Sequence, residues 1–270
     1  MEFMRMGGDN TLNDFRHIPR KRFGQHWLKD QGVLDQIVKA AELNPEDCVL
    51  EVGPGKGALT EKLIESQARF IQAIELDRDL VVGLKKRFSH QNKFSLREGD
   101  ILSAPLDAEN GLTINKVVAN IPYNITGPLL RRLLGELGKS PEKVFDTLVL
   151  LLQKEVAQRI IAQPGDSNFS ALSVRIQLLA ECQGVCDVPS KCFKPEPKVD
   201  SKVILIKPLP LIDPDFYEIG NLLEKLLKLA FSARRKKLRN TIGPFVTSNN
   251  QMQDFFDCRG ISLDQRPQEI

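Results

Sequence analysis

The sequence predicts a doubly wound α/β domain followed by a small helical domain. Short apolar strands alternate with amphipathic helices between residues 33 and 153, a glycine-rich loop follows the first of these strands, and helical apolar spacing returns after residue 208. Alternation of this kind is typical of βαβ units, whose right-handed crossovers build a parallel sheet with helices on both faces. A length of 270 residues is sufficient for two domains.

Each element is predicted from its apolar spacing and from the Gly, Pro and Asn residues that end it. A first helix over 33–41 stops at Asn44-Pro45. Further strands are expected at 48–52, 70–75, 94–96, 116–120, 147–153, 185–188 and 203–206, and further helices at 58–64, 79–88, 129–137 and 216–231. We therefore place a disordered lead-in at 1–15, the α/β domain at 16–207 and the helical domain at 208–270.

Composition excludes several classes of protein. Hydrophobic residues make up 41% and charged residues 27% of the chain, an ordinary globular balance that argues against a disordered or collagen-like chain. Five cysteines are few and odd in number, which favours a reducing compartment, and no apolar run has membrane-spanning or secretory character. The spacing of Cys182, Cys186 and Cys192 matches no structural zinc site. We expect a cytoplasmic monomer without metal and without membrane attachment.

The glycine loop predicts a site for a nucleoside-containing cofactor. Gly53 and Gly55 follow a strand and precede a helix, so the backbone can approach a ligand at a helix N-terminus. Glu75 ends the next strand, twenty residues after Gly55, where a carboxylate accepts hydrogen bonds from ribose hydroxyls. The loop also fits a dinucleotide fingerprint. Glu51, which would repel a pyrophosphate but tolerate a cationic methionine end, favours S-adenosylmethionine, as does the E-x-G-x-G-x-G pattern.

Asp100 extends this site along the edge of the predicted sheet. It follows Gly99 at the carboxyl end of the third strand, where ligands of open α/β sheets gather. Its carboxylate can accept a hydrogen bond from the amino group of a cofactor adenine. A turn or helix-capping role is the alternative for this residue.

The segment Asn120-Ile121-Pro122-Tyr123 predicts a second part of the site, one that holds an exocyclic amine. An apolar strand runs into Asn120, Pro122 forbids its continuation, and Ile121 is pushed towards an extended conformation. The Asn120 oxygen and a nearby main-chain carbonyl can then converge on one NH₂ group, while Tyr123 stacks on its ring. Two acceptors make an adenine amine more nucleophilic and stabilise the positive charge of methyl transfer, without a metal or a cysteine nucleophile. A simple turn that ends the strand is the alternative.

These segments together closely resemble the ribosomal RNA adenine N6,N6-dimethyltransferase family of the KsgA type, over about residues 18–269. The motifs that carry the resemblance are Arg20 to Leu28, Glu51 to Gly57, Ile74 to Asp77, Gly99-Asp100, Asn120 to Ile125, Phe193 to Ser201 and Phe231 to Asn240. The resemblance implies a Rossmann-like class I methyltransferase domain that uses S-adenosylmethionine, leaves S-adenosylhomocysteine, and methylates N6 of two adjacent adenosines near the 3′ end of small-subunit rRNA. Small-subunit rRNA and the precursor of the small ribosomal subunit are the implied partners.

The resemblance also assigns residues by position. It implies contacts with the cofactor from His26, Leu28, Gly53, Gly55, Glu75, Asp100 and Asn120. It implies that Asn120, Ile121, Pro122 and Tyr123 hold the target adenine and that Phe193 stacks on its other face. Phe193 lies in a proline-rich stretch that is unsuited to core burial, although a role as a loop anchor is the alternative.

The sequence departs from the family pattern in two places. His26-Trp27 stands where the family usually has Asn-Phe, and protonation of His26 is expected to make cofactor affinity sensitive to pH. The family also usually continues with a final helix beyond the point where this sequence stops at Ile270, so the helical domain is expected to be either incomplete or shortened.

Two basic clusters are the candidate RNA-binding segments. On a helix, the second cluster would cover most of the circumference and could follow a phosphate backbone. Nine cations lie in these clusters, and without them 29 Lys and Arg would face 35 Asp and Glu, so basic charge is concentrated here. A solvated basic face is the alternative. The candidate residues are Arg20, Lys21 and Arg22, with Arg16 before them, and Arg234, Arg235, Lys236, Lys237 and Arg239.

Three other functions compete with small-subunit rRNA methylation. A large-subunit rRNA adenine methyltransferase of the macrolide-resistance type is the nearest, and the motif at 231–240 argues against it. A DNA adenine methyltransferase lacks support because no DNA target-recognition domain is visible. A non-catalytic ribosome-assembly or transcription factor that keeps the fold is the third, and the intact tetrad at 120–123 argues against such a loss of catalysis.

Overall fold

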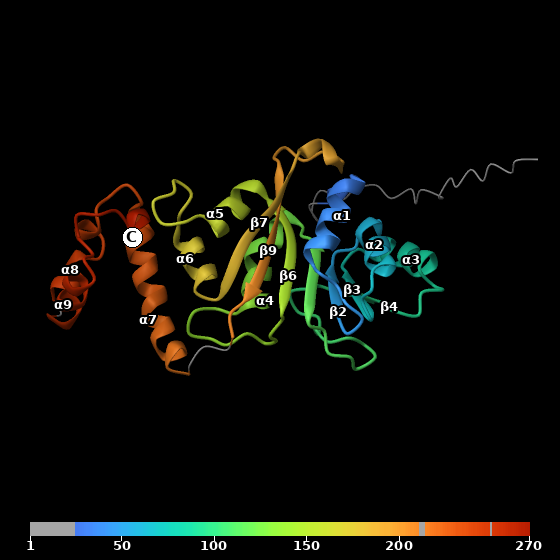
Figure 1. Ribbon diagram of the computed structural model, residues 1–270, viewed down its shortest axis with the longest axis horizontal. Coiled ribbons are helices and arrows are strands. Elements are labelled where there is room, and N and C mark those ends of the chain that lie inside the picture. The colour runs from blue at the N-terminus through green and yellow to red at the C-terminus, as the bar shows by residue number, and fades with distance from the viewer. Residues whose placement is uncertain (1–24, 211–213, 249) are drawn as a thin grey trace, which may run out of the picture.

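A seven-stranded sheet forms the centre of the protein in the computed structural model, which describes residues 25–210, 214–248 and 250–270 (Figure 1). The strand order is β4-β3-β2-β5-β6-β9-β7. The strands are β2 (Cys48–Val52), β3 (Phe70–Glu75), β4 (Phe94–Glu98), β5 (Lys116–Asn120), β6 (Thr147–Gln153), β7 (Ala180–Val188) and β9 (Ser201–Pro208). The first five run parallel, whereas β9 is antiparallel to both β6 and β7. The order reverses between β2 and β5, the point where open α/β sheets bind ligands.

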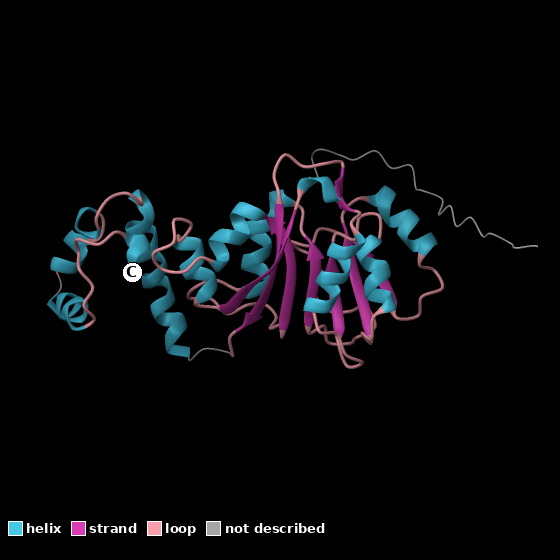
Figure 2. Ribbon diagram, turned by 45° about the horizontal axis from the view of Figure 1, so that its top comes forward, coloured by secondary structure: helices cyan, strands magenta, loops and turns pink. Residues whose placement is uncertain are grey.

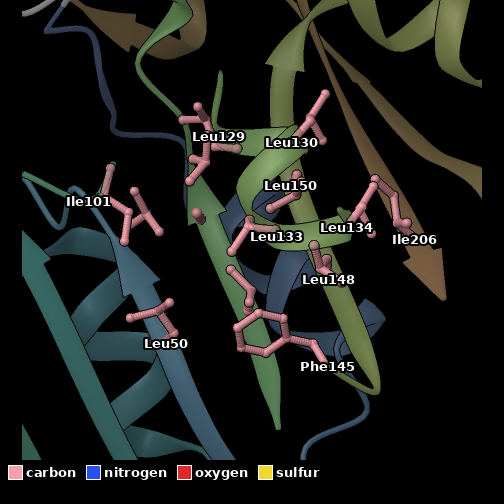
Figure 3. Close-up of a cluster of buried hydrophobic side chains, with 14 of the residues drawn as sticks. Leu50, Ile101, Leu129, Leu130, Leu133, Leu134, Phe145, Leu148, Leu150 and Ile206 are labelled. Atoms are coloured by element: carbon pink, nitrogen blue, oxygen red, sulfur yellow. The ribbon is translucent and has the colours of Figure 1, made fainter. Parts of the chain in front are cut away.

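Helices cover both faces of the sheet, which confirms the doubly wound fold (Figure 2). One face carries α1 (Gln31–Ala40), α2 (Ala58–Glu65) and α3 (Arg78–Arg87), and the other carries α4 (Thr126–Leu134), α5 (Lys154–Ile161) and α6 (Ala171–Gln177). The larger apolar cluster lies between α4 and the central strands, as Figure 3 shows for Leu133, Leu148 and Phe145.

Local sequence explains why these elements form where they do. Strands β2 and β6 are apolar throughout most of their length because both faces are buried, as expected for the interior of a parallel sheet. Helix α1 begins where the Asp30 carboxylate accepts a hydrogen bond of 3.0 Å from the Val33 N–H, and α3 begins at Asp77 in the same way. From α1 to β6, the strand and helix boundaries agree with the sequence predictions within a few residues.

Three features of the sheet region differ from expectation. Strands β7 and β9 are longer than predicted, and β7 contains an irregularity between Gly184 and Cys186. Helices α5 and α6 were not predicted. A two-stranded antiparallel ribbon, β1 (Trp27–Leu28) with β8 (Phe193–Lys194), joins parts of the chain that are far apart in sequence.

The segment after β9 is helical and docks against α6 and the loop between α5 and α6 (Figures 1 and 2). Its helices are α7 (Pro214–Ala230), α8 (Gly243–Thr247) and α9 (Asn250–Cys258), with a small core around Leu238, Ile242 and Val246. None of the helices in the described ranges has the length and hydropathy needed to cross a membrane.

Specific contacts fix this helical segment on the sheet domain. Arg175 on α6 and Glu224 on α7 form a two-pronged ion pair with N···O distances of 2.7 and 2.9 Å. The Arg234 guanidinium donates to the carbonyls of Ser167 and Phe169 at 2.6 and 2.9 Å. Gly138 and Gly220 bring the backbones of the two parts into direct contact, since a Cβ on Gly220 would overlap the main chain of Gly138.

Candidate active site

A cavity of about 330 Å³ opens at the carboxyl ends of the parallel strands. The glycine loop after β2, Glu75 at the end of β3, Asp100 after β4 and the tetrad after β5 all line it. The structure therefore brings the two predicted halves of the site into one cavity. In the described ranges, no three His, Cys, Asp or Glu side chains are grouped as metal ligands would be.

The glycine loop requires glycine for backbone and steric reasons. Gly53, Gly55 and Gly57 have φ values of +63°, +60° and +83°. A Cβ on Gly55 would lie 2.7 Å from Trp27 Cδ1, so the indole ring covers the loop. A Cβ on Gly53 would come within 3.8 Å of Pro122, which places the loop directly beside the tetrad.

Glu75 is held in place by main-chain donors. Its Oε2 accepts from the Gly55 N–H at 3.1 Å, and its Oε1 accepts from the Asp77 N–H at 2.9 Å. Burial raises the pKa of this carboxyl, and the N–H groups of Asp77, Gly55 and Leu76 act in the opposite direction. The carboxylate oxygens keep further acceptor capacity towards the cavity, so the residue fits its predicted ribose-binding role.

Glu51 lies beneath the loop rather than in the cavity lining. It is 1% exposed, and its Oε2 has no hydrogen-bond partner among the described residues. Burial raises its pKa to about 8, with Glu75 adding to the increase and the Thr60 hydroxyl opposing it. The side chain is therefore mainly protonated at neutral pH, so its effect on an anionic ligand is weaker than its place in the sequence suggests.

Asp100 combines the two roles considered for it. Its Oδ1 accepts from the Leu102 N–H at 2.9 Å, which is the turn geometry of the alternative. The exposed residue also lines the cavity beside Ile101. A carboxylate has enough acceptor sites for both partners.

The Asn120 amide is oriented by the main chain. Its Nδ2 donates to the His26 carbonyl at 3.1 Å, and Oδ1 makes none of the hydrogen bonds found within the described residues. This assignment leaves the Asn120 oxygen as an acceptor at the cavity. The Ile121 N–H continues the strand pairing to Leu151 O at 3.2 Å, and Pro122 then ends it.

Tyr123 is held at both ends of its side chain. Its hydroxyl lies 2.7 Å from Ser201 Oγ, and its ring stacks with His26 at a centroid distance of 5.7 Å and an interplanar angle of 23°. Burial raises the pKa of Tyr123, Ser201 lowers it and Asp200 raises it. The phenol therefore stays neutral, and its ring is fixed in the cavity wall.

The structure places Leu28 and Phe193 away from the cavity. They face each other across the β1–β8 ribbon and are 5% and 2% exposed, because both pack into the core beneath α1. The expectation that Phe193 is unsuited to core burial is therefore wrong. A short strand pairing, invisible in the local sequence, carries its ring inward.

Sequence reasoning missed several cavity residues. Leu76 lines the cavity and is 48% exposed, which is unusual for a large apolar side chain and is signalled only by its position after Glu75. Trp27 departs from the family pattern without a predicted role, yet it covers Gly55 and lies 4.8 Å from Lys56 Nζ. Ser201 belongs to a recognised motif, but its bond to Tyr123 required the fold.

The predicted RNA-binding cations do not form one group. Arg16, Arg20, Lys21 and Arg22 lie outside the described residues. The second cluster follows α7 in 3₁₀ turns and a bend, so its expected helical form is wrong. Arg234 bonds main-chain carbonyls of the sheet domain, and Lys237 and Arg239 pair with Asp264 at 3.2 and 2.9 Å. Arg235 and Lys236 are exposed.

The strand order, the antiparallel β9, and the glycine loop beside Glu75 and an Asn-Ile-Pro-Tyr tetrad define a Rossmann-like methyltransferase of class I. Residues 16–266 match the family model described as ribosomal RNA adenine dimethylase, and the chain belongs to that family.

Similar proteins agree with this assignment. A protein of Prochlorococcus marinus (strain NATL2A) named ribosomal RNA small subunit methyltransferase A is 88% identical over 98% of this chain and 91% of its own length. A protein of the same name from Synechococcus sp. (strain CC9902) is 61% identical over 94% of this chain and 92% of its own length.

Two solved structures share the fold. A dimethyladenosine transferase from Plasmodium falciparum superposes with a TM-score of 0.73, at 28% identity over 91% of this chain and 93% of the other. The 23S rRNA methyltransferase ErmE superposes with a TM-score of 0.69, at 26% identity over 90% and 96%.

Proposed function

We propose that this protein transfers methyl groups from S-adenosylmethionine to N6 of two adjacent adenosines near the 3′ end of small-subunit rRNA, during maturation of the small ribosomal subunit. The oriented Asn120 amide carries the proposal, because Asn120 lines the cavity with Tyr123 and the glycine loop, and its oxygen makes none of the hydrogen bonds found within the described residues. The family and the names of its 88% and 61% identical relatives support the substrate. A cytoplasmic monomer is the proposed form of the enzyme.

The cofactor-binding half fits S-adenosylmethionine, which supplies a sulfonium-bound methyl group. Gly53 and Gly55 bring the main chain of the loop to the cavity wall, Glu75 offers acceptors to the ribose, and Asp100 offers one to the adenine amine. Leu76 and Ile101 supply apolar surface for the adenine ring. His26 also lines the cavity, whereas the Leu28 side chain lies in the core.

The target adenosine enters the other half of the cavity. Asn120 Oδ1 and the Ile121 carbonyl accept the two amine hydrogens, and Tyr123 stacks on the base and stabilises the charge that develops on nitrogen. The base must leave its stack to arrive there, at a cost of a few kcal/mol. Phe193 would complete the stack only after its side chain turns out of the core, since it is 2% exposed.

The test measures transfer of radiolabelled methyl groups by the purified full chain. The acceptors are undermethylated small ribosomal subunits, undermethylated large-subunit RNA and adenine-rich DNA, and digestion identifies the modified nucleoside. We expect dimethyladenosine in the small subunit alone, two methyl groups on each of two adenosines. Asn120→Ala should lose transfer by about 10²-fold or more, whereas its affinity for S-adenosylhomocysteine should fall much less.

The other results would each replace the proposal. Label in large-subunit RNA would assign the protein to that substrate, which the likeness to ErmE makes the second candidate. Cofactor binding without label in any acceptor would indicate a non-catalytic assembly or transcription factor. Full transfer by Asn120→Ala would remove the acceptor role of Asn120.

A further inference from the structure

The His26 side chain makes its contacts with the residues that surround the target base. Its ring stacks on Tyr123 at 5.7 Å, and its Nδ1 lies 2.9 Å from the carbonyl oxygen of Pro195. Its own carbonyl accepts the Asn120 amide at 3.1 Å. His26 therefore contacts Asn120, which is proposed to bind the amine, and Tyr123, which is proposed to stack on the base. It also contacts the proline-rich loop between β8 and β9.

The contact with Pro195 fixes the state of the imidazole ring. A carbonyl oxygen only accepts hydrogen bonds, so Nδ1 must carry the proton. The ring is then anchored on one side by this bond and on the other by Tyr123. Tyr123 is in turn anchored through its hydroxyl to Ser201, the first residue of β9.

The neighbouring residue has different contacts. Trp27 covers Gly55 and lies near Lys56, so its side chain belongs to the cofactor half of the cavity. The pair His26-Trp27 thus divides its contacts between the two halves, and His26 belongs with the base.

We propose that His26 is a positioning residue that holds Tyr123 and Asn120 in the geometry needed for the target adenine. It acts through its ring on Tyr123, through Nδ1 on the Pro195 loop and through its carbonyl on Asn120. The proposal rests on the adenine-N6 methyl transfer proposed above, and it assigns His26 to the base side of the cavity in place of the cofactor contact that the resemblance implies. Misplacement of a reacting group by about 1 Å can lower a rate about 10²-fold, so this role is measurable.

Two substitutions separate the contacts of the ring. His26→Asn keeps a donor for Pro195 but removes the ring that stacks on Tyr123. His26→Phe keeps a ring but removes the donor, and His26→Ala removes both. His90→Asn is the matched control, because His90 is exposed in the loop that follows α3 and takes no part in the cavity.

The readouts are kcat and KM for undermethylated small subunits, affinity for S-adenosylhomocysteine by calorimetry, and the melting temperature. We expect kcat to fall about tenfold in His26→Asn and His26→Phe and about 10²-fold in His26→Ala. KM for the particle, cofactor affinity and melting temperature should stay within about twofold or a few degrees of the wild type. His90→Asn should match the wild type in every measurement.

Several outcomes would overturn the proposal. Equal losses in kcat and cofactor affinity would place His26 in the cofactor half. Unchanged kcat in all three variants would leave it without a positioning role, and a higher kcat would show that the ring obstructs the base. Absence of transfer by the wild type would instead refute the proposed function.

Discussion

Single side chains of the site take their positions from main-chain atoms. Asn120 bonds the His26 carbonyl, Glu75 bonds the N–H groups of Gly55 and Asp77, and His26 bonds the Pro195 carbonyl. Main-chain partners move little when a ligand arrives, so the acceptors are oriented before the reaction starts. Preorganised dipoles of this kind stabilise developing charge without a reorganisation cost.

Glu51 makes the stability of the free protein depend on pH. Its pKa is about 8 in the folded state against an ordinary value of 4.5, so between these pH values the unfolded chain loses a proton that the folded chain keeps. The stability of the wild type therefore falls as pH rises through this window. Glu51→Gln lacks this loss, so its melting temperature should exceed that of the wild type by more at pH 8 than at pH 5, by several degrees.

Scanning calorimetry without cofactor measures this difference. Glu65→Gln, an exposed carboxyl at the end of α2, is the control and should run parallel to the wild type at both pH values. A constant gap between Glu51→Gln and the wild type would show that Glu51 is ionised in the folded protein throughout.

Residues of the site were predictable where one motif carries them. The glycine loop, Glu75 and the tetrad at 120–123 each follow a recognisable strand, and parallel strands bring their carboxyl ends to one edge. The burial of Leu28 and Phe193 was not predictable, because it results from a two-residue pairing between segments about 165 residues apart. Local patterning contains no information about such a contact.

Elements were predictable in proportion to their length and burial. The central strands are apolar on both faces and have clear limits, whereas α5 and α6 have eight and seven residues, too few for a distinct helical period. The basic stretch after α7 has helix-forming composition, yet the structure turns it through short 3₁₀ elements. Arg234 bonds two carbonyls of the sheet domain there, and tertiary contacts outweigh local propensity.

Neighbouring cations therefore have different expected roles: Arg234 holds the two domains together, whereas Arg235 and Lys236 are available to bind RNA. Arg235→Glu with Lys236→Glu should weaken binding to small subunits and reduce the salt slope by about 0.7–0.9 for each phosphate that these side chains neutralise in the wild type, with little change in melting temperature. Arg234→Ala should do the reverse, lowering the melting temperature while affinity changes less. Filter binding at several salt concentrations and thermal unfolding measure the two effects.

The two variants serve as controls for each other. An unchanged salt slope in Arg235→Glu with Lys236→Glu would show that these exposed cations form only a solvated face. A stable Arg234→Ala with a reduced slope would return Arg234 to the RNA surface.

The whole molecule is joined by contacts between the sheet domain and the helical segment. The ion pair of Arg175 with Glu224 is about one-third exposed on each side, so its contribution to stability is modest. Two further contacts fix the position and orientation of the helical segment. They are the close backbone packing of Gly138 and Gly220 and the hydrogen bonds from Arg234 to main-chain carbonyls. Apolar spacing in the sequence predicted a helical segment but not these docking contacts, which depend on pairs of residues far apart in the chain.

Replacement of Gly220 by alanine tests this docking, because we expect it to destabilise the protein although the same change in a helix usually stabilises it. Replacing glycine by alanine inside a helix ordinarily stabilises it by about 0.5–1 kcal/mol. In Gly220→Ala, the new methyl group would overlap the main chain of Gly138, so we expect a net loss of about 1–3 kcal/mol in urea unfolding. Gly127→Ala in α4 is the control, since its Cβ meets nothing within 4 Å and should not destabilise. Stabilisation by Gly220→Ala would show that the two backbones are not packed in solution.

The contacts that hold α7 against α6 also determine the distance between the exposed cations after α7 and the cavity. Arg235 and Lys236 follow α7 after four residues, and Arg234 just before them is bonded to the sheet domain, so these contacts set how far the two cations lie from Asn120. A fixed distance between these cations and Asn120 selects the adenosine that lies at the same distance from the bound part of the RNA backbone. An RNA with the same local sequence but a different fold would still bind Arg235 and Lys236 through its backbone. Its adenosine would then lie at the wrong distance to reach Asn120.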